Sequence, residues 1–444
     1  KVVVVGAGPA GASLALLLAR GGVAVTLVEA GTSLERQFRG EALMPSGLEA
    51  LAAMGLLELI PGLPHRPLVE WRFVVNRQEL FTATEPLGGD PSRPCTLVSQ
   101  PALLEALLKR GSTYPPFAIE RGQPVVDLLW QQERVAGVQL RDGSQLPADL
   151  VVGCDGRGSL VRQKAGLAVQ SSPSPIDLLW FQLASPAASP LAGSFTTLVG
   201  PQGVFSAFES ASGGVQLGWV IGKSQATPEL SREGWIERMA ALSPPQLAAW
   251  LRQWRGGLGA PSRLTVQVGL AERWCQPGLL LLGDAAHPMG PVRAQGINMA
   301  LRDAWVAAMR LLPLLSSGCS GAALDGVAVQ IEAERRPEII SMQTLQAAEA
   351  ARGEQLRQQG LATVKEFDAA KFEFDQARLS LEGLAASRRE VASRLRDNSI
   401  VAPVSGVVLA RPVDRGQVVS AQTVIYEIAP LADVEVEADI DERY

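Results

Sequence analysis

Apolar runs of strand length alternate with helical patterns along most of the chain. Val2–Val5 is a continuous apolar run, and a helical pattern covers Ala12–Arg20 after a glycine-rich turn. A second apolar run, Val23–Glu29, completes a strand–helix–strand unit. Continuous apolar strands are typical of parallel sheets that are buried on both faces. The pattern therefore predicts an α/β fold whose parallel sheet resumes at Leu150–Gly153 and Leu279–Leu282.

Between residues 175 and 265 the pattern changes to short strands separated by turns rich in glycine and proline. Strands of this kind form antiparallel sheets, and an amphipathic helix around Trp235–Leu242 follows them. We therefore expect a second, antiparallel sheet with helices on one side, inserted into the first domain. The expected strands are Leu178–Leu183, Ser194–Val199, Val204–Phe208 and Val215–Ile221.

Several other elements are indicated by local signals. Proline in the first turn predicts helices that begin at Pro45 and at Gln100. A small antiparallel meander is expected over Val125–Leu146, and two long helices over Ala300–Leu315 and Val327–Gly353.

Composition excludes some classes of protein without identifying one. With 47% hydrophobic and 19% charged residues, the 444-residue chain can form two or three globular domains. Its net charge of −5 gives no electrostatic reason to expect a nucleic acid partner. The sequence shows no apolar run long enough for a membrane span and no signal peptide, which predicts a cytoplasmic location.

Cysteine and histidine are too sparse for most catalytic centres. Four cysteines lie far apart without a CxxC pair, so we expect no zinc site and a reducing compartment. His65 and His287 are the two histidines, which nearly excludes a histidine-based metal centre or catalytic triad. His287 is expected to be structural. Difficult chemistry would therefore depend on a cofactor.

The first motif with chemical meaning is the turn after Val2–Val5. Gly6, Gly8 and Gly11 have the spacing that allows a tight turn, close approach of a pyrophosphate and close packing of helix on strand. The N-terminus of the following helix would favour the negative charge of the phosphates. Glu29, which ends the second expected strand, can accept hydrogen bonds from both hydroxyls of an adenosine ribose. The turn therefore predicts a dinucleotide site for FAD or NAD.

Two further motifs follow expected strands. Asp155-Gly156 comes after Leu150–Gly153, and its carboxylate could organise backbone N–H groups around a diphosphate. Arg162 follows it and could pair with a phosphate of NAD(P)H, because a guanidinium matches phosphate geometry. Asp284 ends the third strand, and the helix expected near Gly296 would present free N–H groups in its first turn.

In this order and spacing, the three motifs resemble those of the para-hydroxybenzoate hydroxylase-like, FAD-dependent (group A) flavoprotein monooxygenases. The resemblance implies a Rossmann-like FAD-binding domain over residues 1–172 and 269–353, with an inserted substrate domain over residues 173–268. It also implies that NAD(P)H reduces FAD and that O2 supplies one oxygen atom. A small, aromatic substrate would be hydroxylated or epoxidised.

The same resemblance implies roles for individual residues. Arg39 would lie along the ribityl and phosphate part of FAD, Gln100 would contact the flavin side chain, and Asp284 would bind a ribityl hydroxyl. Pro291 and Arg293 are candidates beside the reactive face of the flavin, where no catalytic residue is assigned.

The start of the third motif's helix has a separate implied role. Backbone N–H groups of Gly296, Ile297 and Asn298 would meet the pyrimidine edge of the isoalloxazine ring. This edge carries negative charge in the reduced flavin, so a helix N-terminus there would stabilise it.

The sequence changes character after Gly353. Apolar residues recur at heptad positions over residues 354–399, which predicts a coiled-coil helix that could self-associate. Residues 400–444 indicate β-strands with glycine turns. Together they resemble the second half of a periplasmic adaptor, a membrane fusion protein with a lipoyl-like β-sandwich. This resemblance predicts a fusion with a junction near Gly353–Leu361.

Three alternative functions share parts of this pattern. A flavin-dependent halogenase is disfavoured, because the closest string to its Trp-x-Trp-x-Ile-Pro signature is Gly218–Ile221. An FAD-dependent reductase of the geranylgeranyl reductase-like type stays open. A transport adaptor is disfavoured, because the opposite hairpin helix and the first half of the sandwich are missing from this sequence.

Overall fold

The computed structural model describes residues 1–34, 40–85, 93–185, 189–291, 294–359, 406–413 and 423–430. The chain divides into two compact units, Lys1–Phe374 and Asp375–Tyr444. Within the described residues, every helix is either too short or too polar to cross a lipid bilayer.

The first unit is built on the expected parallel sheet, in which β1 lies between β12 and β2. Its neighbouring strands pair in parallel except β20, which is antiparallel to β21. Both faces are buried, because Val2 and Val4 of β1 belong to one core and Val3 and Val5 to another. In spatial order the strands are β20 (Cys275–Gln276), β21 (Leu279–Leu281), β12 (Leu150–Gly153), β1 (Val2–Val5), β2 (Val25–Glu29) and β8 (Phe117–Arg121).

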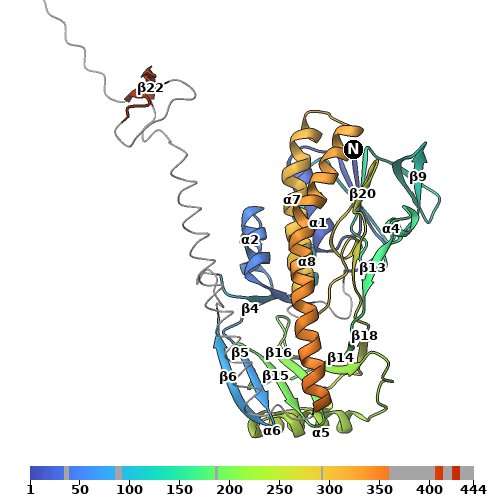
Figure 1. Cartoon of the computed structure of the whole chain (residues 1–444), viewed down its shortest axis with the longest axis vertical. Helices are drawn as coiled ribbons and strands as arrows, with labels where there is room; N and C mark the ends of the chain where they lie inside the picture. Colours follow the sequence, from blue (N-terminus) through green and yellow to red (C-terminus); the bar gives the residue numbers. More distant parts are fainter. Residues whose placement is uncertain are drawn as a thin grey trace, which may run out of the picture. The chain divides into compact units, whose positions relative to one another are not determined.

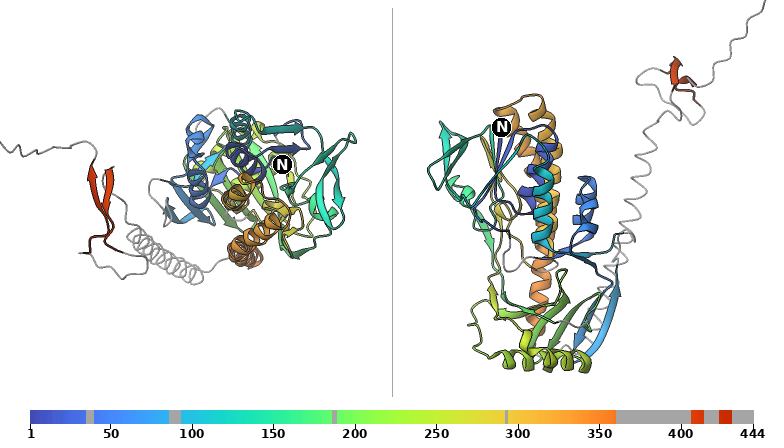
Figure 2. Two further views of the ribbon diagram at one scale, coloured as in Figure 1. Left: turned by 90° about the horizontal axis from the view of Figure 1, so that it is seen from above. Right: turned by 180° about the vertical axis from the view of Figure 1, so that it is seen from behind.

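Helices cover one face of this sheet and a small β-meander covers the other. The meander confirms the expected strands and consists of β9 (Val125–Gln131), β10 (Arg134–Leu140) and β11 (Gln145–Pro147). The helices are α1 (Pro9–Arg20), α2 (Pro45–Ala53), α3 (Gln100–Gly111), α7 (Gln295–Ser316) and α8 (Ala322–Gln359). Both proline-started helices and both long helices were expected, and α8 runs beside α7 in all views (Figures 1 and 2).

A seven-stranded sheet forms the second layer of the unit. Its order is β18-β14-β17-β16-β15-β5-β6, and all pairs are antiparallel except β15 with β5. Helices α5 (Arg232–Leu242) and α6 (Pro245–Gln253) pack on one face of it (Figure 1). The strands are β5 (Glu70–Val75), β6 (Gln78–Thr84), β14 (Ile176–Leu183), β15 (Ser194–Gly200), β16 (Gly203–Glu209), β17 (Val215–Gly222) and β18 (Ser262–Leu264).

The expected division at residues 172 and 173 does not match this sheet. Strands β5 and β6 come from the part of the chain that was assigned to FAD binding, yet they complete the second sheet. The reason is backbone pairing, because Glu70–Val75 hydrogen-bonds in register with Ser194–Val199. The two strands lie far apart in the sequence, and no local pattern predicts that they pair.

Short elements join the two sheets. They include β3 (Ala42–Leu43), β4 (His65–Pro67) and β7 (Thr96–Val98) in one sheet, β13 (Val169–Ser172) with β19 (Val268–Ala271), and helix α4 (Leu160–Lys164).

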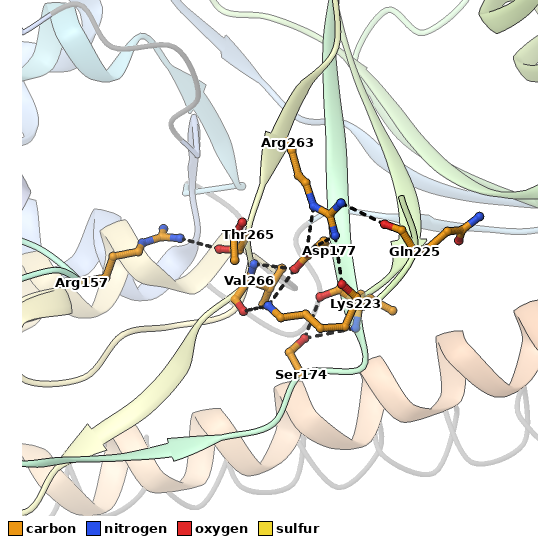
Figure 3. A network of polar contacts seen from close by, with 9 residues as sticks. Arg157, Ser174, Asp177, Lys223, Gln225, Arg263, Thr265 and Val266 are labelled. Atoms are coloured by element: carbon orange, nitrogen blue, oxygen red, sulfur yellow. Dashed lines mark hydrogen bonds and ion pairs between the residues drawn. The ribbon is translucent and has the colours of Figure 1, made fainter. Parts of the chain in front are cut away.

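A buried carboxylate fixes the place where the chain returns from the second sheet to the first (Figure 3). Asp177 on β14 accepts hydrogen bonds from Lys223 at 2.8 Å, Arg263 at 2.8 Å and the backbone N–H of Val266 at 3.0 Å. Burial raises its pKa, but the hydrogen bonds from Lys223 and Arg263 outweigh burial and lower it. Nearby, Arg157 donates to the carbonyl of Thr265 at 3.3 Å. The network therefore holds the connecting segment beside the second motif.

The C-terminal predictions are largely outside the described residues. In the second unit, β22 (Gly406–Ala410) pairs antiparallel with β23 (Glu427–Pro430). The heptad segment beyond Gln359 and its self-association are not described. Helix α8 continues through Gly353 to Gln359, so most of the junction expected near Gly353–Leu361 falls within a helix, and its last two residues lie outside the described residues.

Candidate active site

The three glycines of the first turn have different physical reasons to be glycine. A Cβ on Gly6 (φ +101°) would lie 2.4 Å from the carbonyl oxygen of Cys154, and one on Gly11 would lie 1.9 Å from the Gly6 carbonyl. A Cβ on Gly8 would meet no described atom within 4 Å. Gly8 is also the N-cap of α1, which has no side-chain cap among the described residues. The helix N-terminus therefore faces open space at Gly8.

Glu29 lies beside this turn, as expected. It is buried, and its carboxylate oxygens accept the backbone N–H groups of Ala7 at 2.8 Å and Gly31 at 2.9 Å. These bonds orient the carboxylate at the carboxyl end of β2, where a ribose would lie in a dinucleotide site. Contact of Glu29 with the ribose hydroxyls stays a prediction.

The second motif forms a capped turn. Asp155 accepts hydrogen bonds from the Ser159 hydroxyl at 2.5 Å and the Val161 backbone at 3.0 Å. Burial raises its pKa, and these two hydrogen bonds oppose the rise. Ser159 in turn accepts the backbone N–H of Arg162 at 2.9 Å and caps α4. The turn is thus shaped by its own side chains.

Arg162 joins the second motif to the third. Its side chain is buried, and its guanidinium donates to the carbonyls of Ala285 at 2.7 Å and Arg157 at 3.0 Å. These two bonds give Arg162 a structural role, and its contact with an NAD(P)H phosphate stays a prediction.

Asp284 of the third motif lies at the edge of the site. Burial raises the pKa of its carboxyl, and Arg157 and His287 oppose the rise. The Nε atom of Arg157 is 3.8 Å from Asp284, and its side chain is partly exposed. Arg157, which the sequence did not single out, is therefore the cation of the second motif that faces the expected ribityl site.

A buried network lies behind Asp284. Asp303 on α7 accepts hydrogen bonds from His287 Nε2 at 2.6 Å, the Gly283 backbone at 2.9 Å and Arg335 at 2.8 Å. Burial alone would raise the pKa of Asp303, but His287 and Arg335 lower it to about 2. His287 has no exposed surface and is held by this network, which confirms the structural role expected of it. Asp303 and Arg335 were missed because they lie far apart in the sequence.

The N-terminus of α7 carries the residues expected at the flavin ring. Ala294 has a left-handed backbone (φ +50°), and no side chain of the described residues caps the helix. Asn298 accepts the Met44 N–H at 2.9 Å and donates to the carbonyl oxygens of Ala42 and Ala294. Its side chain thus anchors β3 against α7. Gly296 and Ile297 follow Ala294 in the uncapped first turn, as predicted.

Aromatic side chains face this helix end from the second sheet. They belong to the face opposite α5 and α6, and they share one cluster with Ala294, Met44 and the strand β3. Ring centroids are 5.0 Å apart for Trp71 and Phe195, 5.3 Å for Phe195 and Phe208, and 6.1 Å for Phe208 and Trp180. We call these four side chains the aromatic wall. The wall comes from four strands, β5, β14, β15 and β16.

A cavity of about 330 Å³ adjoins the wall at Trp180. It lies between the end of the second sheet, the first turn of α3 at Gln100, and Glu41. Gln100 is buried, and its Oε1 atom accepts no hydrogen bond from the residues that the structure describes. A buried acceptor without a partner indicates that a ligand or water completes it. The expected flavin contact at Gln100 therefore borders the cavity.

Pro291, Arg39 and Arg293 are the other residues that were expected near the flavin. Pro291 precedes the helix and accepts the Ala294 N–H at 3.0 Å, so it lies in the loop that leads to the aromatic wall. Arg39 and Arg293 lie outside the described residues.

Comparison with known proteins gives matches over the same part of the chain. The family profile described as "FAD binding domain" matches residues 1–344. The 6-methylpretetramide 4-monooxygenase of Streptomyces rimosus is 37% identical over 351 residues, which are 76% of this chain and 80% of the relative. The rifampicin monooxygenase of Streptomyces venezuelae is 29% identical, covering 76% of this chain and 68% of the relative.

Solved structures show the same fold. PqsL of Pseudomonas aeruginosa, in complex with 2-aminobenzoylacetate, has a TM-score of 0.71 at 22% identity and covers 83% of this chain and 99% of its own. The p-nitrophenol 4-monooxygenase PnpA of Pseudomonas putida has a TM-score of 0.70 at 20% identity, with 87% and 97% covered. The matches named here give no support to the adaptor resemblance, the fusion or the coiled coil.

Proposed function

The chain belongs to the FAD binding domain family and is an FAD-dependent monooxygenase, and we propose that it uses NAD(P)H and O2 to hydroxylate or epoxidise a small aromatic substrate. The relatives named above are monooxygenases, so neither a reductase nor an adaptor is favoured. We place the reaction in the cytoplasm, where FAD and NAD(P)H are supplied and where free cysteines such as buried Cys154 stay reduced.

The residues of the first turn fit FAD. Gly6 and Gly11 are glycines because the protein's own backbone leaves no room for a Cβ, whereas Gly8 has open space in front of it. That space lies at the uncapped N-terminus of α1, where backbone N–H groups favour the charge of a pyrophosphate. This is the observation that carries the cofactor site, and Glu29, which lies beside it, would bind the adenosine ribose.

The other residues of the site would bind the rest of FAD and the substrate. When bound, FAD supplies the redox chemistry that NAD(P)H and O2 feed. Asp284 and Gln100 would hold the ribityl part, and the uncapped first turn of α7 at Gly296 would stabilise negative charge on the ring. The aromatic wall would orient a flat substrate and exclude water from the reacting atoms.

A visible spectrum of the purified protein tests the cofactor, and NAD(P)H and O2 consumption with candidate phenols tests the reaction. Asp284→Ala should weaken FAD binding about tenfold or more, because a partly buried hydrogen-bond acceptor for the ribityl chain is lost. Asp142→Ala, in an exposed turn, is the matched control and should leave binding unchanged.

A folded, colourless protein that takes up no added FAD would contradict the proposal. Substrate reduction without O2 consumption would instead restore the reductase alternative.

A further inference from the structure

The 330 Å³ cavity has a polar lining with one acidic group. Three glutamines, Gln100, Gln182 and Gln216, and the hydroxyl of Ser210 present neutral hydrogen-bonding groups to it, and Glu41 presents a carboxyl group. Among the lining residues that the structure describes, none is Lys, Arg or His. A volume of this size is at the lower end of small-molecule pockets. The cavity is therefore built for hydrogen bonds and not for charge pairing with an anion.

Glu41 is fixed in place from the second sheet. Its carboxylate accepts the Ser210 hydroxyl at 2.7 Å and the Ala211 N–H at 2.8 Å. Both donors lie in the turn between β16 and β17, at the end of the aromatic wall. Burial raises the pKa of Glu41, and these two hydrogen bonds oppose the rise. Burial thus already disfavours the negative charge of Glu41 itself. None of the described residues that line the cavity is a cation that could offset a second negative charge from a ligand.

The cavity also lies between the flavin residues and the substrate sheet. Gln100 brings the unsatisfied Oε1 acceptor from the flavin side. Trp180 comes from the aromatic wall, and its indole N–H donates to Gln216 Oε1 at 2.6 Å. A ligand that reaches from the wall into the cavity would therefore stack on aromatic rings at one end. At its other end it would meet amide and hydroxyl groups.

We infer that the site takes an uncharged aromatic substrate whose hydroxyl or amide groups donate hydrogen bonds into the cavity, and that Glu41 rejects aromatic carboxylates. The inference rests on the proposed monooxygenase function and adds its substrate class. A donor on the substrate would satisfy Gln100 Oε1 and add a hydrogen bond to Glu41, whereas a carboxylate would leave Gln100 Oε1 without a donor and bring a second negative charge beside Glu41. Glu41 acts here as a specificity-determining residue.

Two matched ligand pairs test the inference with the FAD-loaded protein at pH 8. The pairs are 4-hydroxybenzamide with 4-hydroxybenzoate, and 2-naphthol with 6-hydroxy-2-naphthoate. Binding is followed by the flavin absorbance and by tryptophan fluorescence, and turnover by O2 consumption. The neutral member of each pair should bind more tightly, by on the order of tenfold to a hundredfold, because like charges in a partly buried site repel.

Three variants test whether charge causes the preference for the neutral ligands. Glu41→Gln keeps the shape and should tighten carboxylate binding about tenfold without loss of FAD. Gln182→Arg, at an exposed lining position, should do the same by adding a cation. Glu209→Gln is the control, because Glu209 pairs with Arg66 at 2.9 Å and does not line the cavity.

Each outcome decides the inference. Equal or tighter binding of the carboxylates by the wild-type protein would overturn it, and so would an unchanged preference in Glu41→Gln. Loss of FAD in Glu41→Gln would assign Glu41 to the flavin site and also overturn it. Failure of both neutral probes to bind at millimolar concentration would do the same. A protein that oxygenates the carboxylates would contradict only the substrate class, whereas a protein without FAD would contradict the proposed function.

Discussion

His287 and Asp303 share a hydrogen bond of 2.6 Å between Nε2 and Oδ2, with both side chains fully buried. Asp303 also pairs with Arg335 on α8 at 2.8 Å and accepts the backbone N–H of Gly283. One carboxylate therefore joins the third motif to the two long helices behind it. Because Asp284 follows Gly283 directly, this network determines the position of the expected ribityl contact.

The Asp303 network predicts a dependence of stability on acid pH. The pKa of Asp303 is about 2 in the folded protein, below its ordinary value of about 3.9. A depressed pKa means that the ionised carboxylate stabilises the fold by about 2.6 kcal/mol at neutral pH, and that this stabilisation is lost progressively as the pH falls from about 5 through about 2. Asp303→Asn should lower the free energy of unfolding at pH 7 by about 3 kcal/mol, because buried Arg335 loses its ionised partner at Asp303 and keeps only its pair with Glu338.

Urea unfolding at pH 7, 5, 4 and 3 measures both effects. The control is Glu334→Gln, which removes an exposed pair with Arg310 and should change stability by about 0.5 kcal/mol or less. A loss in Asp303→Asn as small as in this control would refute the structural role of the network.

The glycine turn predicts opposite outcomes for two similar changes. Gly8→Ala should leave the unfolding temperature of the FAD-free protein unchanged, since its φ of −71° suits alanine and no described atom opposes the Cβ. It should weaken FAD binding about tenfold or more, equivalent to about 1.4 kcal/mol, because the Cβ would enter the pyrophosphate space. Gly11→Ala should instead destabilise the fold itself by about 3 kcal/mol through contact with the Gly6 carbonyl.

Thermal unfolding of both FAD-free variants and FAD titration of Gly8→Ala distinguish these outcomes. If Gly8→Ala bound FAD like the wild type, the open space at Gly8 would not be the cofactor site.

The buried position of Arg162 predicts a loss of stability that affects both cofactors. Arg162→Ala leaves the carbonyls of Ala285 and Arg157 without their donors and should lower the free energy of unfolding by about 2–3 kcal/mol. FAD affinity and the KM for NAD(P)H should worsen together. Arg162→Lys, which keeps one donor, should give an intermediate result.

Steady-state kinetics and FAD titration of the same preparations give the answer. A selective rise in the KM for NAD(P)H, with FAD affinity and stability unchanged, would restore the phosphate contact that the sequence predicted.

The contacts of α8 predict how much of the C-terminal region the flavin site needs. Gln343 donates to the carbonyls of Gly269 and Pro288, and Gln346 donates to Gly290 at 3.0 Å. These bonds hold the loop that follows Asp284. A chain that ends at Gln359 should therefore bind FAD as the full chain does, whereas one that ends at Ser341 should bind it more weakly. FAD titration of the three chains checks this, and loss of binding in the 359-residue chain would show that residues after Gln359 contribute to FAD binding.

The sequence predicted those parts of the fold that depend on neighbouring residues. Apolar runs, glycine turns and proline-started helices are local, so the parallel sheet, α3 and the three motifs were found where expected. The side-chain partners of the motifs were not predictable in the same way. Asp303 meets Arg335 only because α7 and α8 pack together, and Glu41 meets Ser210 only because β3 lies against the second sheet.

Arg162 shows the limit of reasoning from residue type. A guanidinium suits phosphate, but it equally suits a pair of backbone carbonyls, and only the folded structure shows that the carbonyls of Ala285 and Arg157 lie within its reach. The aromatic wall has the same limit. Trp71 and Phe195 meet through the pairing of β5 with β15, which no sequence pattern indicated.

The pairing of β5 with β15 also determines how such an enzyme could acquire a new specificity. Two aromatic-wall residues, Trp71 and Phe195, come from stretches of chain more than a hundred positions apart. An exchange of residues 173–268 with a relative would thus import three of the four wall residues and join them to foreign edge strands. An active chimera would have to exchange residues 70–84 as well. Transfer of a substrate preference between enzymes of this fold therefore requires that two separate segments of the chain are exchanged together.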